Sequence, residues 1–185
     1  MAEIILVTGG ARSGKSKFAE NYAERYGNKI AYIATARILD EEMRFRVEMH
    51  QQRRPAGWHT FEAPDNAHTA INEVSSDHDM ILFDCITIYL SNIIFSLPEL
   101  DDEKEIYKIV QDKISRLIDS ARKSRSTVIF VTNEVGCGIV PENKLARHYR
   151  DLAGMANQML AAAADKVYLA VSGIAVDISK LGEII

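Results

Sequence analysis

The sequence has 185 residues, of which 47% are hydrophobic and 26% charged, with a net charge of −4. These values fit one globular domain with a core and argue against nucleic acid or an anionic membrane surface as the main partner. The two cysteines form no Cys-x-x-Cys pair, so we expect free thiols. No signal peptide is evident, and the longest apolar stretch (85–95) is too short to span a bilayer. We therefore expect a cytoplasmic protein without membrane insertion.

Short apolar runs with strand character alternate with segments of helical periodicity. Strands are predicted over 3–8, 29–35, 79–84, 127–132 and 166–171. Helices are predicted over 15–26, 41–54 (capped by Asp40), 65–75, 86–95, 101–124 and 141–164, the last opened by Pro141. Residues 58–64 are irregular or one short strand, and the tail adds an edge strand. β-Branched residues in 86–95 favour a strand, but its position after a strand-ending Asp favours the helix.

Continuous apolar strands that alternate with helices are typical of a mostly parallel sheet covered on both faces. We find no internal repeat or linker, so the prediction is a three-layer α/β fold occupying residues 1–185 as a single domain. Cys85 and Cys137 are expected to be free, and His59, His68 and His78 are expected to be surface residues without a shared ligand.

The stretch LVTGGARSGKSKFAE (6–20) contains Gly9, Gly14, Lys15 and Ser16 in the spacing G-x-x-x-x-G-K-[ST], between a predicted strand and a predicted helix. Glycines allow backbone N–H groups to converge on phosphate oxygens, and the helix N-terminus adds positive potential. Lys15 reaches the outer phosphates, and the Ser16 hydroxyl can bind Mg²⁺. The pattern predicts a P-loop (RecA-like) nucleotide-binding fold; the alternative is an ordinary glycine turn with an exposed lysine.

Polar residues end two of the predicted strands. Asp84 follows MILF and fits the carboxylate that a P-loop site uses for Mg²⁺, although it could simply cap the next helix. Asn133 and Glu134 end the following strand. In a parallel sheet they lie on the same rim as the P-loop, where ligands bind. The alternative for this pair is turn chemistry before Gly136.

The second predicted helix carries a local basic patch. Arg46, His50 and Arg53 are spaced to share one face, and Arg54 is adjacent. Neighbouring positive charge favours a neutral imidazole, which can act as a nucleophile. A solvated basic face with a bystander histidine is the alternative.

The length favours a small-molecule kinase or nucleotidyltransferase among P-loop proteins. A GTPase switch requires Asn-Lys-x-Asp, and the nearest string, Asn143-Lys144-Leu145-Ala146, lacks the aspartate. Two other functions stay open from the residues alone: a P-loop kinase of another small molecule without a covalent nucleotide, and a regulatory nucleotide-binding module.

The chain resembles the bifunctional adenosylcobinamide kinase/adenosylcobinamide-phosphate guanylyltransferase family nearly from end to end. The stretches that carry the resemblance are ILVTGGARSGKS, YIATARILDEEM, RVEMHQQRRPAGW, VTNEVGCGIVPENKLARHYRDLAGMANQ and VYLAVSGI. The resemblance implies two reactions of cobalamin biosynthesis. A nucleoside triphosphate (ATP or GTP) first phosphorylates adenosylcobinamide. GMP is then transferred from GTP through a guanylylated histidine, here His50, to give adenosylcobinamide-GDP and pyrophosphate.

The resemblance also implies a set of site residues and an assembly. Catalysis is assigned to His50 and Lys15, Mg²⁺ to Ser16 and Asp84, and the assembly is a homo-oligomer, a trimer. The expected nucleotide contacts are Gly9, Gly10, Ala11, Arg12, Ser13, Gly14, Lys15, Ser16, Ala34, Thr35, Ala36, Gln51, Gln52, Arg53, Arg54, Glu62 and Asp84.

Overall fold

The computed structural model describes residues 2–38, 40–97 and 102–182; the side chains of Glu42, Arg46, His50 and Arg53 lie outside the description. The strands are β1 (Ile4–Gly9), β2 (Ile30–Ala34), β3 (His59–Glu62), β4 (Met80–Asp84), β5 (Thr127–Val131), β6 (Lys166–Val171) and β7 (Ile174–Asp177). The helices are α1 (Lys15–Tyr26), α2 (Glu41–Arg53), α3 (Ala67–Val74), α4 (Ile86–Ser96), α5 (Glu103–Lys123), α6 (Lys144–Ala163) and a final 3₁₀ turn (Ile178–Lys180).

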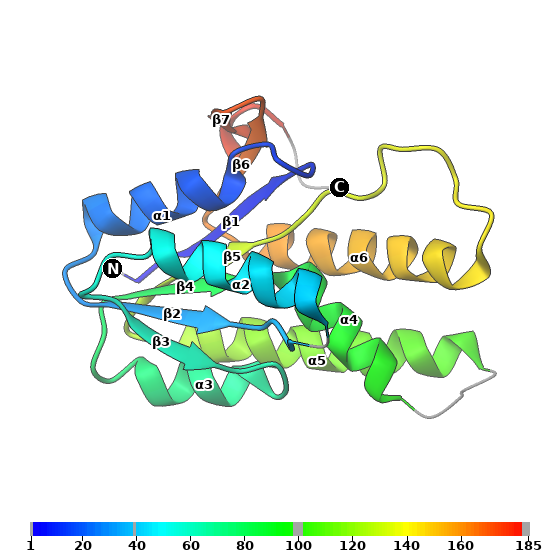
Figure 1. Cartoon of the computed structure of the whole chain (residues 1–185), viewed down its shortest axis with the longest axis horizontal. Helices are drawn as coiled ribbons and strands as arrows, with labels where there is room; N and C mark the ends of the chain where they lie inside the picture. Colours follow the sequence, from blue (N-terminus) through cyan, green and yellow to red (C-terminus); the bar gives the residue numbers. More distant parts are fainter. Residues whose placement is uncertain (1, 39, 98–101, 183–185) are drawn as a thin grey trace.

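The described strands form one seven-stranded sheet in the order β3-β2-β4-β5-β1-β6-β7 (Figure 1). Strands β1 to β6 pair in parallel, and β7 adds an antiparallel edge next to β6. The α/β class, the mostly parallel sheet and the edge strand in the tail are therefore confirmed.

Helices cover both faces of the sheet, giving three layers (Figure 1). One face packs against α1 through residues such as Ile5, Val7 and Leu82. The other packs against α3, α4, α5 and α6 through residues such as Leu6 and Phe83. The central strands are buried on both faces, which is why their sequences are continuously apolar rather than alternating.

The strand register aligns the carboxyl ends of neighbouring strands. Ala34 of β2 lies opposite both Glu62 of β3 and Asp84 of β4, and Asp84 lies opposite Val131 of β5. The loops that leave these strands therefore begin at one rim of the sheet, beside the loop that leaves β1.

Most predicted elements agree with the structure within two residues, and α1 has the predicted bounds. The segment 58–64 contains the short strand β3, which was one of the two alternatives. The predicted start of the last helix at Pro141 is wrong. Asn143 caps α6 instead, because its side chain accepts a hydrogen bond from the Ala146 N–H at 3.1 Å. A side-chain oxygen at the N-cap accepts from a free backbone N–H in the first turn of the helix, and a proline side chain has no such acceptor.

Two further expectations concern isolated side chains. Cys85 and Cys137 are both free, as predicted, the first buried and the second exposed. The description of His78 as a surface residue is wrong, because it is 9% exposed and its Nε2 lies 2.9 Å from Nδ1 of His59. Within the described ranges, no helix combines the length and apolar character needed to cross a membrane.

Candidate nucleotide site

The loop between β1 and α1 is compact, and two of its glycines, Gly9 and Gly14, lie where a side chain would be crowded or strained. A Cβ on Gly9 would lie 2.4 Å from the carbonyl oxygen of Ala170 in β6. Gly14 has φ +95°, a left-handed conformation that glycine adopts without strain, and it directly precedes α1. The N-terminus of α1 therefore opens onto the loop without a side-chain cap, as a phosphate-binding helix requires.

The turn between β6 and β7 packs against this loop. The Gly173 N–H donates to the Ser13 carbonyl oxygen at 2.8 Å, and a Cβ on Gly14 would lie 3.1 Å from Cα of Gly173. The hydroxyl oxygens of Ser13 and Thr8 are buried without a hydrogen-bond partner among the described residues. Unpaired hydroxyls beside a helix N-terminus fit a loop whose partner is an anionic ligand.

Lys15 lies across the mouth of the loop. Its Nζ donates to the Gly10 carbonyl oxygen at 3.2 Å. Burial lowers the pKa of Lys15, while the nearby Cys85 and Asp84 oppose the change. The lysine is therefore partly desolvated, which strengthens its interaction with any anion held by the loop.

Asp84 is held by a buried tyrosine that the sequence analysis did not identify. The hydroxyl of Tyr32, a residue only 2% exposed, donates to Oδ2 of Asp84 at 3.0 Å. Burial first, and then Asp84, raises the pKa of Tyr32 well above its ordinary value, so the hydroxyl remains a donor. The guanidinium carbon of Arg54 lies 3.5 Å from the centroid of the Tyr32 ring, a cation–π contact. The predicted residues Asp84 and Arg54 thus meet through Tyr32.

The segment Ala34 to Ala36 is joined to the end of β4. The Cys85 N–H donates to Oγ1 of Thr35 at 2.9 Å, and that hydroxyl donates to the Cys85 carbonyl oxygen at 2.9 Å. Burial raises the pKa of the Cys85 thiol to about 11, so it is protonated at neutral pH and is not a nucleophile. Thr35 is therefore fixed beside Asp84, whereas Glu62, paired with Ala34, is exposed at the end of β3.

A second polar network fixes the end of β5, and it was missed because its members are far apart in the sequence. The Asn133 amide Nδ2 donates to Oγ1 of Thr87 at 2.9 Å, and the Tyr149 hydroxyl donates to the Thr87 carbonyl oxygen at 2.9 Å. Asn157 accepts from the Thr132 hydroxyl at 2.6 Å and donates to the Asn133 carbonyl oxygen at 3.2 Å. These bonds join β5, α4 and α6 at the rim.

The helix predicted to carry the basic patch is present as α2, and Asp40 caps it by accepting from the Met43 N–H at 2.6 Å. The side chains of Arg46, His50 and Arg53 lie outside the described residues, so their approach to the P-loop stays a prediction. Gln51 and Gln52 are exposed along the same helix.

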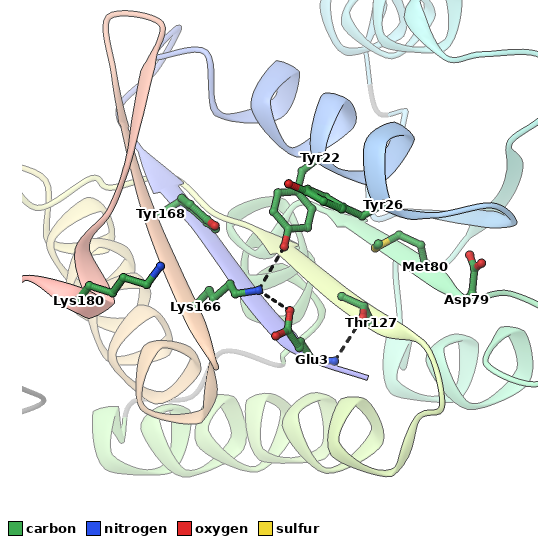
Figure 2. Close-up of a pocket in the computed structure, with 9 residues that line it drawn as sticks. All are labelled: Glu3, Tyr22, Tyr26, Asp79, Met80, Thr127, Lys166, Tyr168 and Lys180. Atoms are coloured by element: carbon green, nitrogen blue, oxygen red, sulfur yellow. Dashed lines mark hydrogen bonds and ion pairs between the residues drawn. The ribbon is translucent and has the colours of Figure 1, made fainter. Parts of the chain in front are cut away.

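A hollow of about 430 Å³ lies at the opposite end of the sheet, lined by residues at the amino ends of β1, β4, β5 and β6 (Figure 2). Its two lysines are paired within the protein: Lys166 contacts Glu3 at 2.7 Å, and Lys180 contacts Asp177 at 3.0 Å. Its location and pairing separate this hollow from the P-loop rim.

Comparisons with known proteins identify the family of the chain. A family model described as cobinamide kinase / cobinamide phosphate guanyltransferase matches residues 5–178. The chain is 48% identical over 180 residues to the bifunctional adenosylcobalamin biosynthesis protein CobU of Salmonella typhimurium, covering 95% of this chain and 99% of that protein. It is 43% identical to the Escherichia coli CobU with the same coverage. It is 36% identical over 171 residues to the Pseudomonas aeruginosa CobP, covering 91% and 93% of the two chains.

Proposed function

Because the chain belongs to the cobinamide kinase / cobinamide phosphate guanyltransferase family, an enzyme family of cobalamin biosynthesis, we propose that its P-loop rim serves both reactions. The observation that carries this proposal is the arrangement of Lys15, which crosses the P-loop mouth, beside Asp84, which Tyr32 holds in place. This arrangement suits a bound triphosphate that is attacked at either its γ-phosphorus or its α-phosphorus.

In the first step, the hydroxyl oxygen of adenosylcobinamide attacks the γ-phosphorus of ATP or GTP. The bond to the β,γ-bridging oxygen breaks, the nucleoside diphosphate leaves, and the hydroxyl proton is lost. Lys15 and the backbone N–H groups of the loop offset the charge on the transferring phosphoryl group. The positive potential at the N-terminus of α1, next to Gly14, also offsets this negative charge.

In the second step, we propose that neutral His50 attacks the α-phosphorus of GTP and that pyrophosphate leaves. The resulting phosphoramidate retains the activation of GTP. A phosphate oxygen of adenosylcobinamide phosphate then attacks the same phosphorus, giving adenosylcobinamide-GDP and free His50. Arg46, Arg53 and Arg54 are proposed to offset negative charge during this exchange.

The chain offers a suitable donor set for Mg²⁺, which would offset phosphate charge when bound. Magnesium is commonly held by one or two protein oxygens together with phosphates and water, so the Ser16 hydroxyl and the Asp84 carboxylate fit it. The described residues contain no group of three or more His, Cys, Asp and Glu side chains that could form a protein-only metal cage.

We further propose one domain over residues 1–185 acting in the cytoplasm as a homotrimer. The support for an oligomer is the apolar surface of α2, where the Phe45 side chain is 63% exposed and Met49 is 37% exposed. A neighbouring copy that covers this surface would place the proposed guanylyl carrier close to a subunit boundary.

The test measures transfer of label from γ-labelled nucleotide and from α-labelled GTP to the corrinoid. With adenosylcobinamide as acceptor, γ-labelled nucleotide should yield labelled adenosylcobinamide phosphate, and α-labelled GTP should yield labelled adenosylcobinamide-GDP. Lys15→Ala should abolish the first product. His50→Ala should abolish the second when adenosylcobinamide phosphate is supplied, while still forming the first. A folded wild-type protein that labels neither corrinoid would overturn the proposal.

A further inference from the structure

The proposed kinase step must remove a proton from the acceptor hydroxyl, and a carboxylate at the P-loop rim is the suitable group. The candidates at the carboxyl ends of the parallel strands are Glu62, which ends β3, Asp84, which ends β4, and Glu134, three residues after β5. Asp65 is three residues after β3 but is paired with Arg37. Their positions in the sheet order and their contacts separate their roles.

Glu62 and Asp84 are poorly placed for this task. The strand of Glu62 is four positions from β1, which is about 19 Å at the usual spacing between strands. Asp84 accepts the Tyr32 hydroxyl at 3.0 Å and interacts with the charged Lys15. Asp84 is therefore already engaged by a hydrogen-bond donor, and the proposed function assigns it to Mg²⁺ rather than to the acceptor proton.

Glu134 lies next to the phosphate loop. Its backbone N–H donates to the carbonyl oxygen of Gly9, the first P-loop glycine, at 3.0 Å. β5 pairs directly with β1, so no strand separates the two. Because the residue before it, Asn133, is fixed by Thr87 and Asn157, the carboxylate extends from a rigid strand end.

The Glu134 side chain is oriented by the turn that follows. The Gly136 N–H donates to Oε1 at 2.6 Å, and a Cβ on Gly136 would lie 2.9 Å from that oxygen. In the described part of the chain, no lysine, arginine or histidine forms an ion pair with Glu134. The Gly136 bond engages one oxygen and leaves Oε2 available to a substrate.

We infer that Glu134 is a catalytic residue that accepts the proton of the adenosylcobinamide hydroxyl during phosphoryl transfer. The oxygen–γ-phosphorus bond forms as the bond to the bridging oxygen breaks, the proton passes to Oε2, and the nucleoside diphosphate takes the bonding electrons. This inference rests on the proposed function. It assigns no role to Glu134 in the guanylylation of His50, where neutral imidazole has no proton to lose from its attacking nitrogen.

Glu134→Gln tests the inference because glutamine keeps an oxygen that can accept from the Gly136 N–H but has no basic carboxylate. Transfer from γ-labelled nucleotide to adenosylcobinamide should fall about 100-fold or more in kcat, the usual contribution of a general base. Labelling of the protein by α-labelled GTP should stay within about threefold of wild type, showing that the site is folded and binds nucleotide.

Glu142→Gln is the matched control, because Glu142 is an exposed glutamate on the same connection between β5 and α6. It should leave both readouts unchanged. Gly136→Ala should lower phosphorylation without lowering protein labelling, because its Cβ displaces the carboxylate.

The outcomes distinguish this inference from the proposed function. If wild type phosphorylates adenosylcobinamide and Glu134→Gln does so within a few fold, Glu134 is only a turn residue and the inference is wrong. Loss of both readouts in Glu134→Gln also contradicts it, since the residue would then support the fold or nucleotide binding. If wild type does not phosphorylate adenosylcobinamide, the proposed function fails instead.

Discussion

At the scale of single residues, Tyr32 connects two site residues that come from different elements. Its hydroxyl donates to Asp84 and its ring lies beneath the Arg54 guanidinium, at the end of the helix that carries His50. The two partners have opposite charges, and the tyrosine contacts both without being ionised. A buried aromatic residue can therefore set the position of the carboxylate that we propose to hold Mg²⁺.

Tyr32→Phe removes one hydroxyl and retains the ring beneath Arg54. We expect the free energy of unfolding to fall by about 2 kcal/mol, because the partly buried Asp84 carboxylate loses a hydrogen-bond donor. Urea unfolding followed by circular dichroism measures this change. Tyr26→Phe is the control, since Tyr26 is 59% exposed, and it should unfold like wild type. Equal midpoints for Tyr32→Phe and wild type would show that the hydrogen bond contributes nothing.

At the scale of elements, the junction between β1 and α1 depends on close contact with β6. Gly9 approaches the backbone of Ala170, and Ser13 accepts from Gly173 in the turn after β6. The phosphate loop is therefore shaped by β6 and the turn that follows it, as well as by its own glycines. This explains why a loop rich in flexible residues has a defined conformation before nucleotide binds.

Gly9→Ala should destabilise the nucleotide-free protein by about 1–3 kcal/mol, because the added Cβ would lie 2.4 Å from the Ala170 carbonyl oxygen. Thermal unfolding without nucleotide measures the effect. Gly10→Ala provides a neighbouring comparison, because nothing lies within 4 Å of its added Cβ. Its stability should change by less than about 0.5 kcal/mol. Equal unfolding temperatures for Gly9→Ala and Gly10→Ala would contradict the close packing of β1 against β6.

At the scale of the whole molecule, local patterns predicted the elements better than the contacts between them. The apolar strands and the P-loop helix follow from periodicity and glycine chemistry, and both are confirmed. The network from Asn133 to Thr87 joins residues 46 positions apart, so no local pattern indicates it. The Tyr32–Asp84 bond likewise depends on β2 pairing with β4 across 52 positions.

The proposed site residues also differ in how far the sequence alone predicts their positions. Lys15 and Asp84 could be predicted because each directly ends or follows a recognisable element, and the structure brings them together. Arg54 was named from its place next to Arg53 in the basic patch, but its contact with Tyr32 required the fold. The function of His50 was inferred from the family resemblance, and its role remains a prediction for this chain.

The role of His50 is tested most directly by locating the GMP adduct on the protein. Wild-type enzyme is incubated with GTP and Mg²⁺, digested with trypsin at neutral pH to preserve the phosphoramidate, and analysed by mass spectrometry. We expect GMP on the peptide spanning residues 47–53, attached to His50 and removed when adenosylcobinamide phosphate is added before digestion. GMP attached to another residue, or its absence from a protein that still forms adenosylcobinamide-GDP, would contradict the assignment of His50 as the guanylyl carrier.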